Sequence, residues 1–83
     1  MFGTELKKKT DTLDKIEALE AAMLKQLQNG ELFAEDADAA REAGDGEAQM
    51  NNITCQQTCM IAASAYANVV LALRKKMETG ELD

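Results

Sequence analysis

The chain has 83 residues, a formal net charge of −6 and no His, Trp or Pro. Without His, the commonest general base and transition-metal ligand, and with an acidity that opposes phosphate neutralisation, we expect no enzyme, no metal or cofactor and no direct nucleic-acid contact. The residues after Lys7-Lys8-Lys9 are too polar for a secretory signal, so the expected location is the cytoplasm of a bacterial or phage-infected cell.

The composition favours helices. Ala, Leu, Glu, Lys, Met and Gln, which are strong helix formers, dominate the sequence, whereas β-branched and aromatic residues are few. We therefore predict an all-α fold in one domain spanning residues 1–83. A chain of this size buries only a marginal core alone, which favours assembly with other helices.

Residues 4–28 are predicted to form the first helix. Thr4 is a suitable cap, and apolar side chains recur mostly at three- or four-residue steps: Leu6, Leu13, Ile16, Leu19, Met23 and Leu27. Asn29-Gly30 predicts the end of this helix, because Gly readily adopts the left-handed conformation found just after a helix. Segments 25–32 and 75–82 share Lys, Gly, Glu and Leu at matching positions, which is typical of two helix ends; an internal duplication is the alternative.

Segment 31–47 carries seven acidic residues and one basic residue, Arg41, which together equal the net charge of the whole chain. Its Ala-rich pattern predicts a short helix over 32–43, which Gly44-Asp45-Gly46 ends. A calcium loop is rejected, since Arg41 occupies the position of the Gly that such a loop requires. Four of the acids form a face that is either solvated or a docking surface for a basic partner: Glu35, Asp36, Asp38 and Glu42.

Residues 46–79 are predicted to form the longest helix, and no charged residue lies between Ala48 and Leu73. Two apolar seams run along this helix, which indicates two packing partners. The first seam comprises Cys55, Cys59, Ala62, Tyr66, Val69, Leu73 and Met77. The second seam, together with Tyr66, is the predicted oligomer interface: Ile53, Met60, Ala63, Tyr66, Ala67 and Val70.

The predicted architecture is a helical hairpin of two long helices, with the short acidic helix in the connection. We expect this hairpin to assemble into a homo-oligomer of the four-helix-bundle type. The long connection also allows an open, domain-swapped arrangement of the two long helices. The apolar stretch 59–73 is shorter than the roughly twenty residues of a membrane span and contains Ser64 and Asn68, so no membrane helix is expected.

Cys55 and Cys59 lie one turn apart on the predicted helix, where the geometry disfavours a disulfide between them. Two thiolates do not complete a zinc site. We interpret both cysteines as small buried apolar side chains. The alternative is a redox or soft-metal role shared across a subunit interface.

The leading hypothesis is a non-enzymatic helical interaction protein, such as a small chaperone, an adaptor or a phage-type inhibitor. It would self-associate through residues 53–77 and occlude the surface of an unidentified protein partner. The first alternative is an acidic decoy that inhibits a nucleic-acid-binding enzyme through residues 31–47. The second alternative is a ligand or metal sponge with pockets at subunit interfaces around Cys55, Cys59, Tyr66 and Asn68.

Overall fold

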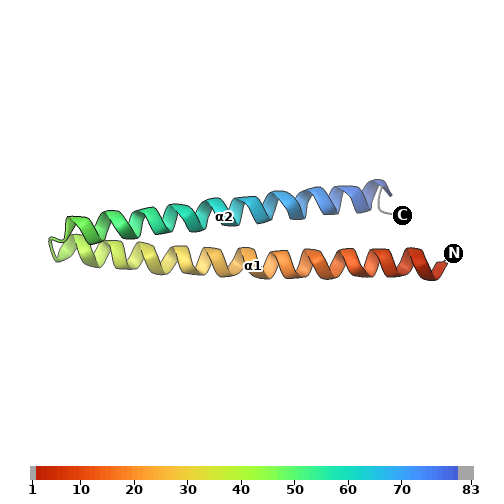
Figure 1. Ribbon diagram of the computed structural model, residues 1–83, viewed down its shortest axis with the longest axis horizontal. Coiled ribbons are helices and arrows are strands. Elements are labelled where there is room, and N and C mark those ends of the chain that lie inside the picture. The colour runs from red at the N-terminus through yellow and green to blue at the C-terminus, as the bar shows by residue number, and fades with distance from the viewer. Residues whose placement is uncertain (1, 81–83) are drawn as a thin grey trace.

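The computed structural model describes residues 2–80, with side chains from residue 7 onward, so the predicted roles of the Thr4 and Leu6 side chains lie outside the described residues. Two helices form within this range, α1 (Phe2–Glu42) and α2 (Gly46–Thr79), and they run antiparallel side by side (Figure 1). The molecule measures 65 × 16 × 13 Å, and its radius of gyration of 18.5 Å exceeds the ~12 Å of a compact domain of this length. The predicted all-α helical hairpin is therefore confirmed, in the form of a rod.

A short loop between Glu42 and Gly46 reverses the chain. Gly44 has a φ of 75°, and the amides of Gly44 and Asp45 donate to the carbonyls of Arg41 (3.1 Å) and Ala40 (2.9 Å). These bonds satisfy carbonyl groups that the end of α1 leaves without helical partners. Asp45 then caps α2, because its Oδ1 accepts a hydrogen bond from the amide of Ala48 at 3.1 Å.

The helix end predicted at Asn29-Gly30 is wrong. α1 continues through Gly30 to Glu42, so residues 32–43 do not form a separate acidic helix. Gly30 is buried, and a Cβ added to it would lie 3.6 Å from the Cβ of Cys59 on α2. Glycine at this position lets the two helices approach closely, and packing against α2 offsets the low helix propensity of glycine.

Each helix turns one narrow seam towards the other. Seam residues recur at alternating three- and four-residue steps, which is the spacing of a coiled coil. On α1 the seam comprises Thr12, Ile16, Leu19, Met23, Gln26, Gly30, Phe33, Ala37 and Ala40. On α2 it comprises Gln49, Asn52, Gln56, Cys59, Ala63, Tyr66, Val70, Leu73 and Met77. Among the described residues the buried apolar core consists of only Ile16, Ala37, Cys59, Ala63 and Val70.

The observed seam of α2 draws on both predicted seams. Cys59, Tyr66 and Leu73 belong to the first predicted seam, whereas Ala63 and Val70 belong to the second. α1 therefore covers the strip between the two predicted seams and leaves the outer members of each uncovered.

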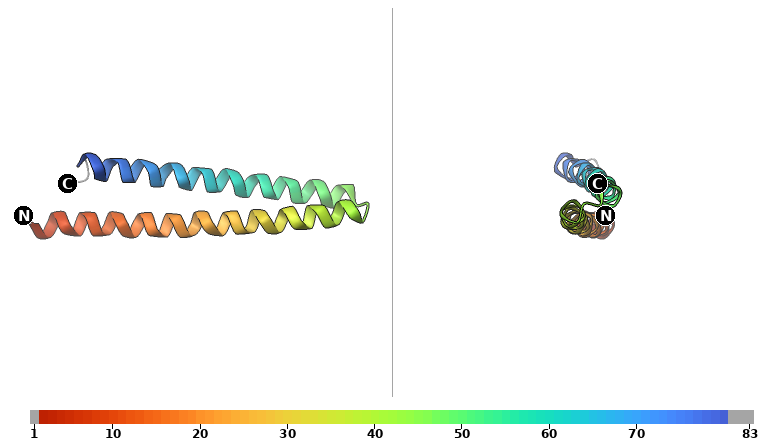
Figure 2. Two further views of the ribbon diagram at one scale, coloured as in Figure 1. Left: turned by 180° about the vertical axis from the view of Figure 1, so that it is seen from behind. Right: turned by 90° about the vertical axis from the view of Figure 1, so that its left-hand side faces the viewer.

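The two helices lie closer together at the loop than at the opposite, open end of the rod (Figures 1 and 2). Small seam residues such as Gly30, Ala37 and Ala40 permit the close approach towards the loop, and larger ones such as Ile16 and Leu73 hold the helices apart at the open end. The end-on view in Figure 2 shows that each helix has the other on one side alone. Neither helix, over the described residues, contains a stretch long and apolar enough to cross a membrane.

Candidate interaction face

The hairpin leaves many large apolar side chains in contact with solvent. Nine are exposed among the described residues, and their exposed fractions run from 38% at Leu27 to 70% at Ile61. Six of the nine directly follow a seam residue in the sequence: Leu13, Leu24, Leu27, Met50, Met60 and Leu71. Residues in that position project to one side of an antiparallel helix pair, whereas residues that directly precede a seam residue project to the other.

We call this side the apolar flank, defined by the six exposed residues above together with half-buried Ile53 and Ala67. Of the remaining exposed apolar residues, Leu32 and Val69 precede seam residues and lie on the opposite flank, and Ile61 lies on the outer back of α2. Exposed apolar side chains gathered on one side make this flank the candidate contact face of the rod.

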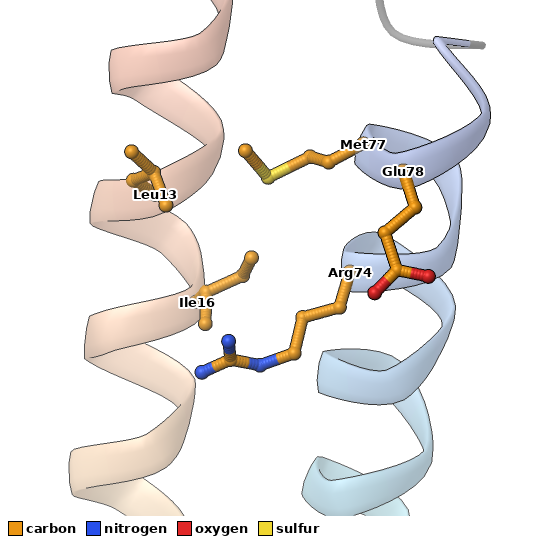
Figure 3. Close-up of a pocket in the computed structure, with 5 residues that line it drawn as sticks. All are labelled: Leu13, Ile16, Arg74, Met77 and Glu78. Atoms are coloured by element: carbon orange, nitrogen blue, oxygen red, sulfur yellow. The ribbon is translucent and has the colours of Figure 1, made fainter.

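Two shallow hollows open on the apolar flank, between the helices. The central hollow lies near the middle of the rod and is lined by Met23, Leu27, Met60, Ala63, Ser64 and Ala67. The open-end hollow is lined by Leu13, Ile16, Arg74, Met77 and Glu78. Figure 3 shows Leu13 and Ile16 on α1 facing Met77 and Arg74 on α2 across this second hollow.

Each hollow encloses about 180 Å³. Pockets that bind small molecules or cofactors usually measure about 300–1,000 Å³. The hollows therefore match individual protruding side chains of a protein surface better than a small ligand.

An ion pair crosses the apolar flank near the open end. The guanidinium of Arg74 on α2 donates to the Oε1 of Glu20 on α1, and both residues directly follow seam residues. The exposed fractions of the two side chains are 51% and 43%, so water screens the pair and its contribution to the stability of the hairpin is small. This contact confirms that residues directly following seam residues lie on the same side of the rod in both helices.

The exposed area shows how much surface the rod leaves uncovered. The chain exposes 6151 Å², whereas a folded monomer of 9.0 kDa is expected to expose about 4,900 Å². The excess, about 1,300 Å², is spread over the whole rod and follows from its elongated shape.

The residues of the predicted oligomer interface occupy two different places. Ala63 and Val70 are buried in the seam against α1, and Tyr66 is half-buried there. Met60 is 51% exposed on the apolar flank, beside half-buried Ile53 and Ala67. The flank also includes residues of α1 that the sequence did not mark as a contact surface, above all Leu24. These residues are identified because they directly follow seam residues, and the seam itself is defined only by the contact between α1 and α2.

The predicted acidic face lies at the loop end of the rod. Glu35, Asp36, Asp38 and Glu42 are all exposed, and Asp38 pairs with Arg41 at 3.7 Å. The face is therefore accessible, and no described contact ties it to α2.

The two cysteines differ in their surroundings. Cys59 is buried opposite Gly30, as a small seam residue, whereas Cys55 is exposed. Within the described residues no three side chains of His, Cys, Asp or Glu are grouped to hold a metal ion. Asn68 is exposed and Tyr66 is half-buried.

Comparison of the chain with protein-family models, with curated proteins and with solved structures gives no match.

Proposed function

We propose that this chain is a non-enzymatic helical interaction protein that self-associates through its apolar flank and acts by occluding the surface of a partner protein. The observation that carries the proposal is the gathering of six exposed, large apolar side chains on one side of a two-helix rod. Covering that side would remove apolar surface from water, which is the main favourable term in the association of helices.

The thin core supports the same proposal. Only five apolar residues are buried in the described part of the chain, and only two of them, Ile16 and Val70, have larger side chains. Two helices alone seldom bury enough surface to be stable, and a second pair of helices supplies the missing layer.

The test is the mass of the protein in solution, measured by light scattering on a size-exclusion column in low and high salt. We expect a dimer or a larger species that persists in high salt, because apolar association is not screened by ions. A helical monomer of 9.0 kDa at all concentrations would overturn the proposal.

Matched pairs of variants locate the contact. Met60→Lys and Ile61→Lys both place a charge on α2, but the first lies on the apolar flank and the second on the back. Leu24→Lys and Leu32→Lys form a second pair on α1, with exposed fractions of 54% and 58% in the unaltered protein. We expect the flank variants to raise the dissociation constant at least about 30-fold and the two controls to leave it near the wild-type value.

A second candidate function is the acidic decoy for a nucleic-acid-binding enzyme. The exposed acids of segment 31–47 are concentrated near the loop, at one end of a rod 65 Å long, and this placement favours it. The test measures cleavage by a DNA nuclease with and without the protein. The decoy predicts inhibition that falls with salt and with Asp36→Asn plus Asp38→Asn, yet is unchanged by Met60→Lys; inhibition that follows Met60→Lys instead would contradict it.

A further inference from the structure

We infer that the apolar flank is covered by a second copy of this chain lying antiparallel, with the loops at opposite ends and Met50 and Ile53 of each copy seated at the open-end hollow of the other. The inference rests on the proposed self-association and adds its geometry. The two-fold axis lies in the plane of the flank and crosses the rod, so that α2 packs on α2 of the second copy and α1 on α1.

The heights of residues along the rod follow from one contact. Gly30 lies opposite Cys59, and in antiparallel helices each step before Gly30 is matched by a step after Cys59. Ile16 is then level with Leu73, and Met23 with Tyr66, which agrees with their shared seam. By the same ladder, the centre of the central hollow is level with Ser64.

A two-fold axis at the level of Ser64 pairs large side chains with small ones. Met60 lies one turn before Ser64 and Ala67 nearly one turn after it, so Met60 of each copy faces Ala67 of the other across the axis. Ala63, Ser64 and Ala67 line the central hollow, and the exposed Met60 of the second copy supplies the side chain that fills it.

The same axis accounts for the ends of the flank. Ile53 and Met50 lie about 16 and 21 Å from Ser64 towards the loop, at 1.5 Å per residue. Arg74 and Met77, which line the open-end hollow, lie about 15 and 20 Å from Ser64 in the opposite direction. An axis set by the central hollow therefore places the exposed Met50 and half-buried Ile53 of one copy over the open-end hollow of the other.

A parallel dimer, with both loops at one end, lacks this complementarity. Equal heights would face each other, so the open-end hollow would meet the same hollow of the second copy and leave an unfilled space, which close-packed interfaces avoid.

A self-complementary surface of this kind indicates a second copy rather than an unrelated protein. Hollows and the side chains that fill them lie on the same flank, related by one two-fold rotation, which is the signature of an isologous interface. One broad side of a rod that measures 65 × 16 Å is large enough for the ~800 Å² that each partner contributes to an interface of standard size.

The first test uses cysteine cross-linking. Ser64→Cys is introduced into a chain whose native cysteines are removed by Cys55→Ser and Cys59→Ala, after light scattering has shown that this background keeps the wild-type mass. We expect Ser64→Cys alone to form disulfide-linked dimers under mild oxidation, because the axis brings the two copies of residue 64 together. The control, Ile61→Cys, lies on the back of α2 and is expected to stay unlinked.

The same cross-linking experiment can also contradict the antiparallel arrangement. In a parallel dimer Ser64 would face Leu24 of the second copy, so cross-links that form only when Ser64→Cys and Leu24→Cys chains are mixed would overturn the inference. A dimer that links in neither experiment would overturn it as well, while leaving the proposed function in place. A monomer in the unaltered protein would contradict the proposed function itself.

The second test keeps the native cysteines and exchanges the large and small residues. Met60→Ala is expected to raise the dissociation constant at least about tenfold by opening a space, and Ala67→Met to do so by overfilling it. The double variant restores one large side chain facing one small side chain, so we expect it to return to within about threefold of the wild type. Additive losses in the double variant would contradict the pairing of Met60 with Ala67.

Discussion

The two halves of the rod hold their helices together in different ways. In the open-end half, most seam residues are bulky and apolar: Ile16, Leu19, Met23, Tyr66, Val70 and Leu73. In the loop half, most seam residues are small or polar: Gln26, Gly30, Ala37, Asn52, Gln56 and Cys59. The first half relies on the removal of apolar area from water, and the second on close approach of the two backbones.

The loop half compensates for its small side chains by its turn. The carbonyls of Arg41 and Ala40 accept hydrogen bonds from Gly44 and Asp45, and Asp45 caps α2. Its polar seam residues are not orphaned: no buried side-chain nitrogen or oxygen lacks a hydrogen-bond partner in the described part of the chain, and the amide of Asn52 donates to the carbonyl of Ala48 at 2.9 Å. The open-end half is therefore stabilised by burial of bulky side chains, and the loop half by hydrogen bonds between residues close in sequence.

The largest effect is expected from Ile16→Ala in the open-end half. Ile16 is 3% exposed, and its truncation leaves a cavity that should lower the free energy of unfolding by about 2–5 kcal/mol. Urea unfolding followed by circular dichroism, at one protein concentration because association shifts stability, measures the loss. Cys59→Ala is the control in the loop half and should cost only about 1 kcal/mol, since it removes a single side-chain atom from the seam. Equal losses would remove the distinction between the halves.

The next effect concerns close approach at Gly30. Gly30→Leu should lower the free energy of unfolding by about 1–3 kcal/mol, because the side chain would push against Cys59. Gly30→Ala is the matched control: a Cβ there lies at an ordinary contact distance of 3.6 Å, so the higher helix propensity of Ala should raise stability by about 0.5–1 kcal/mol. Thermal and urea unfolding of both variants check the change of sign. A Gly30→Leu protein as stable as the wild type would show that the helices are not held close at this point.

A smaller effect is expected at the turn. Gly44 has a φ of 75° and nothing within 4 Å of an added Cβ, so the cost of Gly44→Ala comes from backbone strain alone. We expect a loss of about 1–2 kcal/mol, measured in the same urea experiment. Gly46→Ala is the control, since Gly46 begins α2 and also has open space around its Cβ position. If both substitutions proved neutral, the turn would not be what compensates for the small seam of the loop half.

The smallest effect belongs to the ion pair in the open-end half. A double-mutant cycle with Glu20→Gln and Arg74→Gln should give a coupling energy of about 0.2–1 kcal/mol in the free chain, because both side chains remain largely in water. The coupling is expected to decrease as salt is added. Unfolding at several salt concentrations measures it, and a coupling that grows with salt would argue against a direct contact.

Much of the fold follows from local signals in the sequence. The scarcity of β-branched and aromatic residues predicts helices, and the Gly44-Asp45-Gly46 segment predicts the point of reversal, because a left-handed residue followed by a helix cap is encoded within a few positions. The predicted range 46–79 coincides with α2 for the same reason.

The sequence-based predictions fail where the local structure depends on a residue far away in the sequence. Asn29-Gly30 has the local pattern of a helix end, but Cys59, on the other helix, makes a buried glycine favourable there. The position of the candidate contact face is missed for a similar reason: α2 is apolar around most of its circumference, so its sequence does not show which strip α1 covers and which strip remains as the apolar flank. Leu13 and Leu27 belong to the predicted inner stripe of α1, and the pairing with α2 leaves them 52% and 38% exposed.

The short loop also orders the events of folding. In an antiparallel hairpin, the separation along the chain between facing seam residues increases steadily with distance from Gly44. The pairs nearest the loop therefore close the smallest loops, and each later pair adds little further loss of entropy. The loop half, whose seam residues are small or polar, pairs where the entropy cost of loop closure is lowest. The open-end half, whose seam residues are bulky, pairs last. We therefore expect Gly44→Ala chiefly to slow refolding and Ile16→Ala chiefly to speed unfolding, and stopped-flow kinetics that reversed these two roles would contradict a hairpin that zips from its loop.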